Sequence, residues 1–176
     1  MLMLPAQAPE SSPPAPSHPT RRRLLFLSAA IAVLALDQLT KQLVRSLMDR
    51  GDAWPADWPV RLHYVTNTGA AFGILKDQTG FLILTTLIGL AAIYLYYRFP
   101  PFDHIIVPMA VGMMLGGALG NLLDRIRLGR VTDFIQFPHY PAFNVADSSI
   151  VIAITALLVG YALLPTSAKP PAHEGT

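Results

Sequence analysis

Four long hydrophobic segments dominate the pattern of apolar and polar positions along this chain. The first covers residues 24–36 and continues at helical spacing through Leu39, Leu43 and Leu47, and the others cover residues 81–97, 105–123 and 143–164. Each of the last three contains roughly 17 to 22 residues, enough for an α-helix to cross about 30 Å of hydrocarbon. The pattern therefore predicts four transmembrane helices.

The first segment also allows a second interpretation. Arg21, Arg22 and Arg23 directly precede it, and a basic cluster followed by about 13 apolar residues is typical of a cleavable signal peptide. We favour a membrane-spanning helix because the apolar spacing continues past Asp37. The basic cluster places the beginning of this helix in the cytoplasm, although the arginines and lysines of the two outer loops weigh against that orientation.

The stretches outside the hydrophobic segments complete the predicted organisation. Residues 1–22, rich in proline, are expected to form a disordered cytoplasmic tail, residues 23–165 a four-helix membrane domain, and residues 166–176 a flexible cytoplasmic tail. In the first external loop, Val60, Leu62 and Tyr64 alternate with polar residues, which indicates a strand on the membrane surface. The predicted fold class is an all-α membrane protein with four transmembrane helices and a small extracytoplasmic β element in the first external loop.

Composition supports a membrane protein and removes several other classes. Hydrophobic residues make up 52% of the 176 residues and charged residues only 14%, roughly half the charged fraction of a typical soluble domain. The net charge of +2, without a basic stripe that carries aromatics, gives no reason to expect nucleic-acid binding. The absence of cysteine excludes disulfides, thiolate nucleophiles and cysteine-bound metals.

Two Asn-x-x-Asp pairs carry the candidate chemistry. Asn121 and Asp124 end the third hydrophobic segment, and Asn144 and Asp147 begin the fourth, so both pairs lie at the same face of the membrane. Charged groups are costly inside a membrane and generally have a function. Two carboxyl groups brought together can act as an aspartyl protease pair, in which one activates a water and the other donates a proton to the carbonyl oxygen.

Each of these residues also has a purely structural interpretation. Asn144 with Asp147 is typical of a helix N-terminal cap, with an acid where the helix dipole favours negative charge. Asp124 is harder to explain in this way, because it lies at a helix C-terminus, where the dipole disfavours an anion. Asp37 and Lys41, four residues apart, form a self-neutralising pair for which we favour a structural role.

Other chemistries and functions find less support in the sequence. It contains neither His-Glu-x-x-His nor Gly-x-Ser-x-Gly nor a phosphate-binding glycine loop. Asn67-x-Gly69 is by itself typical of a turn. A small proton-coupled transporter remains an alternative, although its essential acid usually lies well inside a span. A non-catalytic membrane scaffold is another, because the glycines of the third segment suit close helix packing.

Five short motifs together resemble the bacterial lipoprotein signal peptidases (type II signal peptidases). They occur in the order of that family and cover about residues 24–164. The motifs are Asp37-Gln-Leu-Thr-Lys41, Asn67-Thr-Gly69-Ala-Ala-Phe72, Gly120-Asn121-Leu-Leu-Asp124-Arg125, Val131-Thr-Asp133-Phe134 and Phe143-Asn144-Val-Ala-Asp147.

The resemblance implies an aspartic endopeptidase of the bacterial cytoplasmic (inner) membrane. It implies removal of signal peptides from diacylglyceryl-modified prolipoproteins just before the lipidated cysteine, inhibition by globomycin-type cyclic peptides, and no metal or cofactor. We expect a monomeric, multi-pass protein with both termini in the cytoplasm and the active site at the outer face. On this resemblance the catalytic pair is Asp124 and Asp147, supported by Asp37, Lys41, Asn67, Gly69, Asn121, Arg125, Asp133 and Asn144.

Overall fold

The computed structural model describes residues 19–69, 75, 77–100 and 104–163. It contains the helices α1 (Pro19–Leu47), α2 (Thr79–Arg98), α3 (Ile106–Leu128) and α4 (Val145–Leu163). All four are long and apolar enough to cross a membrane, which confirms the four predicted spans. The predicted terminal tails, apart from residues 19–22 at the start of α1, lie outside the described residues.

Helix α3 is the central element of the bundle. It packs against α1, α2 and α4, and it is more buried than the other three helices. It extends to Leu128, five residues beyond its predicted end, so that Asp124 and Arg125 lie inside the helix. Gly129 ends it with a positive φ of 69°, a conformation that glycine adopts without steric cost.

Glycines on α3 allow its neighbours to approach closely. A side chain at Gly112 would collide with the Phe26 carbonyl of α1, and a Cβ at Gly116 would lie 2.5 Å from the Ala30 carbonyl oxygen. On another face, a Cβ at Gly117 would lie 2.6 Å from the carbonyl oxygen of Ala146 in α4. The small residues of α3 therefore bring α1 and α4 within backbone contact, as expected for packing inside a membrane.

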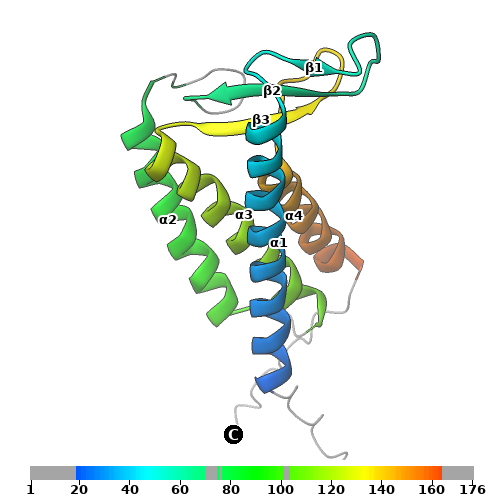
Figure 1. The fold of residues 1–176 in the computed structure, drawn as a ribbon. Coiled ribbons are helices and arrows are strands. Elements are labelled where there is room, and N and C mark those ends of the chain that lie inside the picture. The colour runs from blue at the N-terminus through cyan, green and yellow to red at the C-terminus, as the bar shows by residue number, and fades with distance from the viewer. Residues whose placement is uncertain (1–18, 70–74, 76, 101–103, 164–176) are drawn as a thin grey trace, which may run out of the picture.

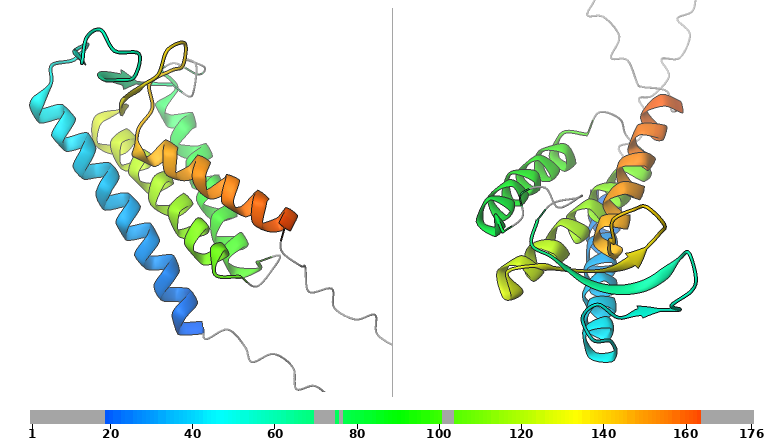
Figure 2. Two further views of the ribbon diagram at one scale, coloured as in Figure 1. Left: turned by 90° about the vertical axis from the view of Figure 1, so that its right-hand side faces the viewer. Right: turned by 90° about the horizontal axis from the view of Figure 1, so that it is seen from above.

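A three-stranded antiparallel sheet lies across one end of the bundle, opposite the first turn of α1 and the last turn of α4 (Figure 1; Figure 2). Its strands are β1 (Ala53–Trp54), β2 (Arg61–Asn67) and β3 (Val131–Gln136), in the order β1-β2-β3. The predicted strand in the first loop is confirmed as β2 and its partner β1. Strand β3 comes from the connection between α3 and α4, for which the sequence analysis expected only a loop.

The close contact at Gly116 generates a test of the packing. Gly116→Ala should lower the free energy of unfolding by about 1–3 kcal/mol, because the added methyl group forces α1 and α3 apart. Thermal unfolding in detergent measures this effect. Gly89→Ala in α2 is the matched control: a Cβ there meets no atom within 4 Å, so the variant should be as stable as wild type or slightly more stable. Equal losses in both variants would contradict this account of the α1–α3 contact.

Candidate active site

The first turn of α4 places Asp147 next to a cap formed by Asn144. The Asn144 side-chain oxygen accepts from the Asp147 backbone N–H at 3.0 Å, and Asp147 Oδ2 accepts from the Asn144 backbone N–H at 3.2 Å. The capping interpretation of this pair therefore describes a real feature of the helix. The cap is not the whole role of this carboxylate. Its Oδ1 atom accepts a further hydrogen bond from Asn121 Nδ2 at 2.8 Å, and the residue is only half-buried.

Asn144 also connects this carboxylate to a second one. Its Nδ2 group donates to Asp133 Oδ1 at 2.6 Å, and it lies near the oxygen of Asn121 and the Thr132 carbonyl. The other oxygen of Asp133 accepts from Asn67 Nδ2 at 3.1 Å. One buried asparagine thus holds the carboxyl groups of both Asp133 and Asp147.

Asp133 lies on β3, and its electrostatic surroundings favour the protonated form. Its side chain is 2% exposed. Burial and, after it, the negative charge of Asp147 raise the pKa of Asp133 from 3.8 to about 6, against the lowering effect of hydrogen bonds from Asn67 and Asn144. Near neutral pH this carboxyl can therefore exchange a proton readily, as one member of an acid pair requires.

The structure places Asp124 in a different environment. Its carboxylate lies 3.5 Å from Lys41 Nζ and 3.6 Å from Arg45, and it accepts from the Thr132 backbone N–H at 3.0 Å. It is 2% exposed, and within the described part of the chain no hydrogen bond joins it to Asp147. The two cations offset the unfavourable helix dipole, so an anion at this position no longer requires a catalytic explanation.

Lys41 is buried at the centre of an ion cluster. Its ammonium, 0% exposed, contacts Asp37 Oδ2 at 2.9 Å and Asn121 Oδ1 at 2.8 Å, besides Asp124. Asp37 Oδ1 in turn accepts from the backbone N–H of Ala146 at 3.0 Å, in the first turn of α4. The Asp37–Lys41 pair thus holds α1, α3 and α4 together, which agrees with the structural role favoured from the sequence.

The remaining predicted residues surround the two acids. Asn67 forms a turn through its oxygen, which accepts from the Gly69 N–H at 2.9 Å, while its amide group holds Asp133. Residues 70–72 of that motif lie outside the described residues. Arg125 is half-buried and interacts electrostatically with Asp147 and Asp133. Together with Asn121 it lines a cavity of about 250 Å³.

Three polar residues of this network were not singled out from the sequence. Gln38 donates to Asp37 and Gly120, Arg45 contacts Asp124, and Thr132 donates to Asp124. Arg45 carried a usable signal, because it follows Lys41 at the same four-residue interval that separates Lys41 from Asp37 and so lies on the same helix face. The role of Thr132 depends on its backbone N–H in β3 and has no signal in the sequence.

Comparison with known proteins identifies the family of this chain. The family described as Signal peptidase (SPase) II matches residues 29–163. The chain is 41% identical over 146 residues to a lipoprotein signal peptidase of Dehalococcoides mccartyi, covering 81% of this chain and 91% of the relative. It is 40% identical over 133 residues to one of Moorella thermoacetica, covering 75% and 89%.

This chain belongs to the signal peptidase II family. It is therefore a protease and a multi-pass membrane protein, which confirms the family resemblance and the enzyme class, and the transporter and scaffold alternatives are set aside. A bacterial membrane enzyme solved at 2.3 Å resolution has the same fold, with a TM-score of 0.73 and 30% identity over 78% of this chain and 87% of that one. A second, solved at 1.9 Å, has a TM-score of 0.71.

The raised pKa of Asp133 generates a prediction about stability. This carboxyl binds its proton more tightly in the folded chain than in the unfolded chain. The bound proton therefore stabilises the folded chain below about pH 4, and this stabilisation is lost as the pH rises through about 6. An amide in its place stays neutral at every pH, so the stability of Asp133→Asn relative to wild type should increase by about 2–3 kcal/mol over that interval. Thermal unfolding in detergent between about pH 4 and 8 measures the difference.

The exposed Asp57 provides the control for this experiment. Asp57→Asn should show no such trend relative to wild type. A pH-independent difference between wild type and Asp133→Asn would show that the carboxyl has an ordinary pKa in the folded protein.

Proposed function

We propose that this peptidase removes signal peptides from diacylglyceryl-modified prolipoproteins, cleaving just before the lipidated cysteine, and that Asp147 and Asp133 form its catalytic pair. The observation that carries the proposal is the position of Asn144, which holds both carboxyl groups in a member of this family. The names of the relatives support lipoproteins as the substrate class.

The choice of Asp133 departs from the pairing of Asp124 with Asp147 that the sequence analysis predicted. An acid of the catalytic pair has to alternate between charged and neutral forms during the reaction. The carboxylate of Asp124 is engaged by two cations instead, Lys41 at 3.5 Å and Arg45 at 3.6 Å. Asp133 is held by amide groups in place of cations, and the charge of Asp147 favours its protonated form.

The reaction then follows from the different exposure of the two acids. Asp147, half-buried and adjacent to a cavity of about 480 Å³, takes a proton from a water as that water attacks the scissile carbonyl carbon. Protonated Asp133 donates a hydrogen bond to the carbonyl oxygen and stabilises the charge that develops there. When the C–N bond breaks, the leaving amine takes the proton from Asp147. We assign Asp147 as the partner that is ionised at rest, because a helix N-terminus favours negative charge.

We place both termini in the cytoplasm, with the sheet and the catalytic pair at the outer face of the inner membrane. Arg21 and Arg23 are exposed in the first turns of α1, at the end of the bundle away from the sheet (Figure 1), where the positive-inside rule expects cytoplasm. A lipid-linked substrate reaches the pair laterally through the bilayer, and the scissile bond then lies near the headgroup level, where water is available.

Three Asp→Asn variants test the assignment by cleavage of a diacylglyceryl-cysteine peptide in detergent. Asp147→Asn and Asp133→Asn should each lower kcat by about 10²–10⁴-fold while the protein remains folded, because each removes an acid–base group. Asp124→Asn should keep cleavage within about tenfold of wild type but destabilise the protein by roughly 3 kcal/mol, because a buried cation cluster loses an anion.

Controls separate catalysis from folding. Asp57→Asn, at an exposed position, should behave as wild type in both assays, and globomycin should block cleavage by every active variant. Normal turnover by Asp133→Asn, together with a folded but inactive Asp124→Asn, would support Asp124 and Asp147 as the catalytic pair. Normal turnover by Asp147→Asn would exclude both proposed aspartyl pairs.

A further inference from the structure

Arg45 is the polar link between α1 and the strand that carries Asp133. Its Nη1 atom donates to the hydroxyl oxygen of Thr132 in β3 at 3.0 Å and lies 3.6 Å from the carboxylate of Asp124. Within the described part of the chain, no other side chain of α1 forms a hydrogen bond with β3. The polar connection between this helix and this strand therefore depends on a single guanidinium group.

Thr132 is held at each of its three polar groups by a residue from a different part of the bundle. Its hydroxyl accepts from Arg45 of α1, and its backbone N–H donates to Asp124 of α3 at 3.0 Å. Its carbonyl accepts at 3.3 Å from Asn144, which directly precedes α4. Thr132 is 1% exposed, so solvent does not compete for these contacts. Because Asp133 is the next residue, the position of its backbone follows that of Thr132.

The amide group of Asn144 makes the orientation of Asp133 sensitive to Thr132. Its Nδ2 atom has three acceptors within reach: Asp133 Oδ1 at 2.6 Å, Asn121 Oδ1 at 3.1 Å and the Thr132 carbonyl oxygen at 3.3 Å. An amide nitrogen carries only two hydrogens, so these three acceptors compete for them. A displacement of Thr132 changes how the hydrogens are shared and, with it, the hydrogen bond that orients the carboxyl of Asp133.

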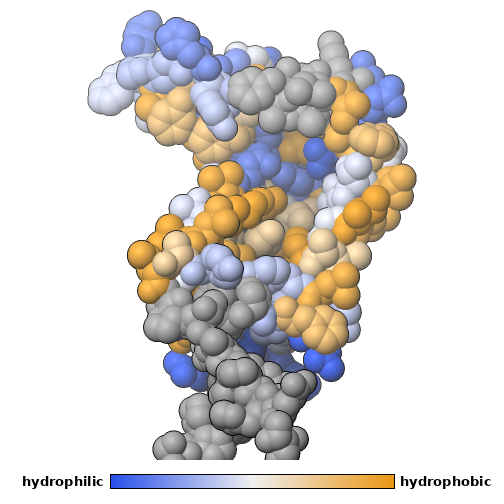
Figure 3. Space-filling model, turned by 180° about the vertical axis from the view of Figure 1, so that it is seen from behind, coloured by the Kyte–Doolittle hydropathy of each residue, from blue (hydrophilic) through white to orange (hydrophobic). Residues whose placement is uncertain are grey.

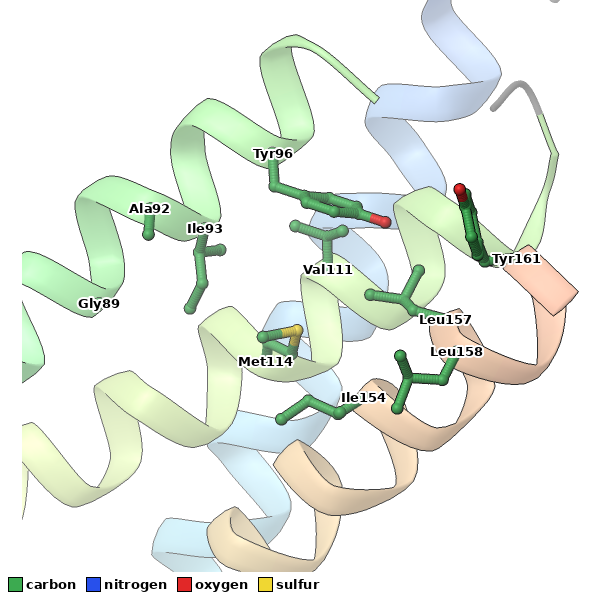
Figure 4. A pocket seen from close by; sticks show the side chains of 10 residues that line it. All are labelled: Gly89, Ala92, Ile93, Tyr96, Val111, Met114, Ile154, Leu157, Leu158 and Tyr161. Carbon is green, nitrogen blue, oxygen red and sulfur yellow. The ribbon is translucent and has the colours of Figure 1, made fainter. Parts of the chain in front are cut away.

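Arg45 belongs to the helix on the side of the bundle opposite the hollow surface. Seen from behind, that surface is hollowed below the sheet, with hydrophilic residues deep in the hollow (Figure 3), whereas α1 runs along the front (Figure 1). The cavity of about 590 Å³ is lined by residues of α2, α3 and α4 (Figure 4). Neither Arg45 nor Thr132 lines this cavity or those of about 250 and 480 Å³. A substitution at either residue therefore leaves these linings unchanged.

We propose that Arg45 is a positioning residue, which acts on Asp133 through the hydroxyl of Thr132. The inference rests on the proposed function, in which Asp133 donates a hydrogen bond to the carbonyl oxygen. Lys41, fully buried, also lies beside Asp124, so the charge of Asp124 does not depend on Arg45 alone for a counter-ion. A misplaced Asp133 weakens a hydrogen bond that strengthens in the transition state, so the contact with Thr132 acts on kcat and leaves KM unchanged.

The test measures cleavage of a diacylglyceryl-cysteine peptide by Arg45→Met and Thr132→Val, singly and together. Methionine removes the donor, and valine replaces the hydroxyl with a methyl group. Each single variant should lower kcat by about tenfold or more, because a small displacement far from the reacting atoms can cost on the order of 10²-fold. KM should stay within about twofold of wild type. The double variant should be within about twofold of the slower single variant, because both substitutions break the same contact.

Three further variants serve as controls. Thr132→Ser keeps the hydroxyl and should restore kcat to within about twofold of wild type. Arg50→Met and Thr155→Val make the same substitutions at exposed positions and should behave as wild type. Thermal unfolding in detergent identifies a temperature at which every variant is folded, and kcat is compared at that temperature.

Each remaining outcome overturns a specific claim. A wild-type kcat for Thr132→Val would overturn the inference even if Arg45→Met did not fold, because the valine variant leaves every charge of the cluster in place. Losses that multiply in the double variant would show that Arg45 acts as a counter-ion of Asp124 and not through Thr132. If wild type does not cleave the peptide, or if Asp133→Asn cleaves it normally, the proposed function or its catalytic pair fails instead, whatever the effect of Arg45→Met.

Discussion

The buried ammonium of Lys41 is the constraint on which the rest of the structure depends. A cation with no exposed surface inside an apolar bundle requires several oxygen partners, and it has three in Asp37, Asp124 and Asn121. Because these partners lie on α1 and α3, the charge fixes how the two helices meet. It also orients Asn121: since the side-chain oxygen accepts from Lys41, the amide nitrogen is directed toward Asp147. The ion cluster thus orients the asparagine that donates to Asp147.

The four acids near the end of the bundle divide into two kinds by their partners. Asp37 and Asp124 contact cations, whereas Asp133 and Asp147 receive hydrogen bonds from asparagine side chains and backbone N–H groups. A cation adds a full positive charge beside a carboxyl group, whereas an amide donor orients the carboxyl group without adding one. In the proposed mechanism, the asparagines hold these two acids in place while one accepts a proton and the other donates a hydrogen bond.

Features specified by local sequence could be predicted, and those that depend on distant contacts could not. The four spans, the Asn144–Asp147 turn and the Asp37–Lys41 pair follow from composition and from spacing along one helix. Strand β3 was missed because its six residues become a strand by pairing with β2, which lies more than 60 residues earlier. The dipole argument for Asp124 considered only its own helix, whereas the cations beside its carboxylate come from α1, about 80 residues away in sequence. A local electrostatic argument cannot include partners that only the tertiary fold provides.

Glycine has opposite effects on the two sides of α3. Toward α1 and α4, Gly116 and Gly117 allow backbone contact, so that side of the bundle is closed. Toward α2, a Cβ on Gly89 would meet no atom within 4 Å, and Gly89 lines a cavity of about 590 Å³. On the closed side, Asn121 of α3 and Asn144, which directly precedes α4, both contact the carboxylate of Asp147. Glycine therefore permits close packing between the helices that the ion cluster connects, and it leaves space where α2 lines the cavity.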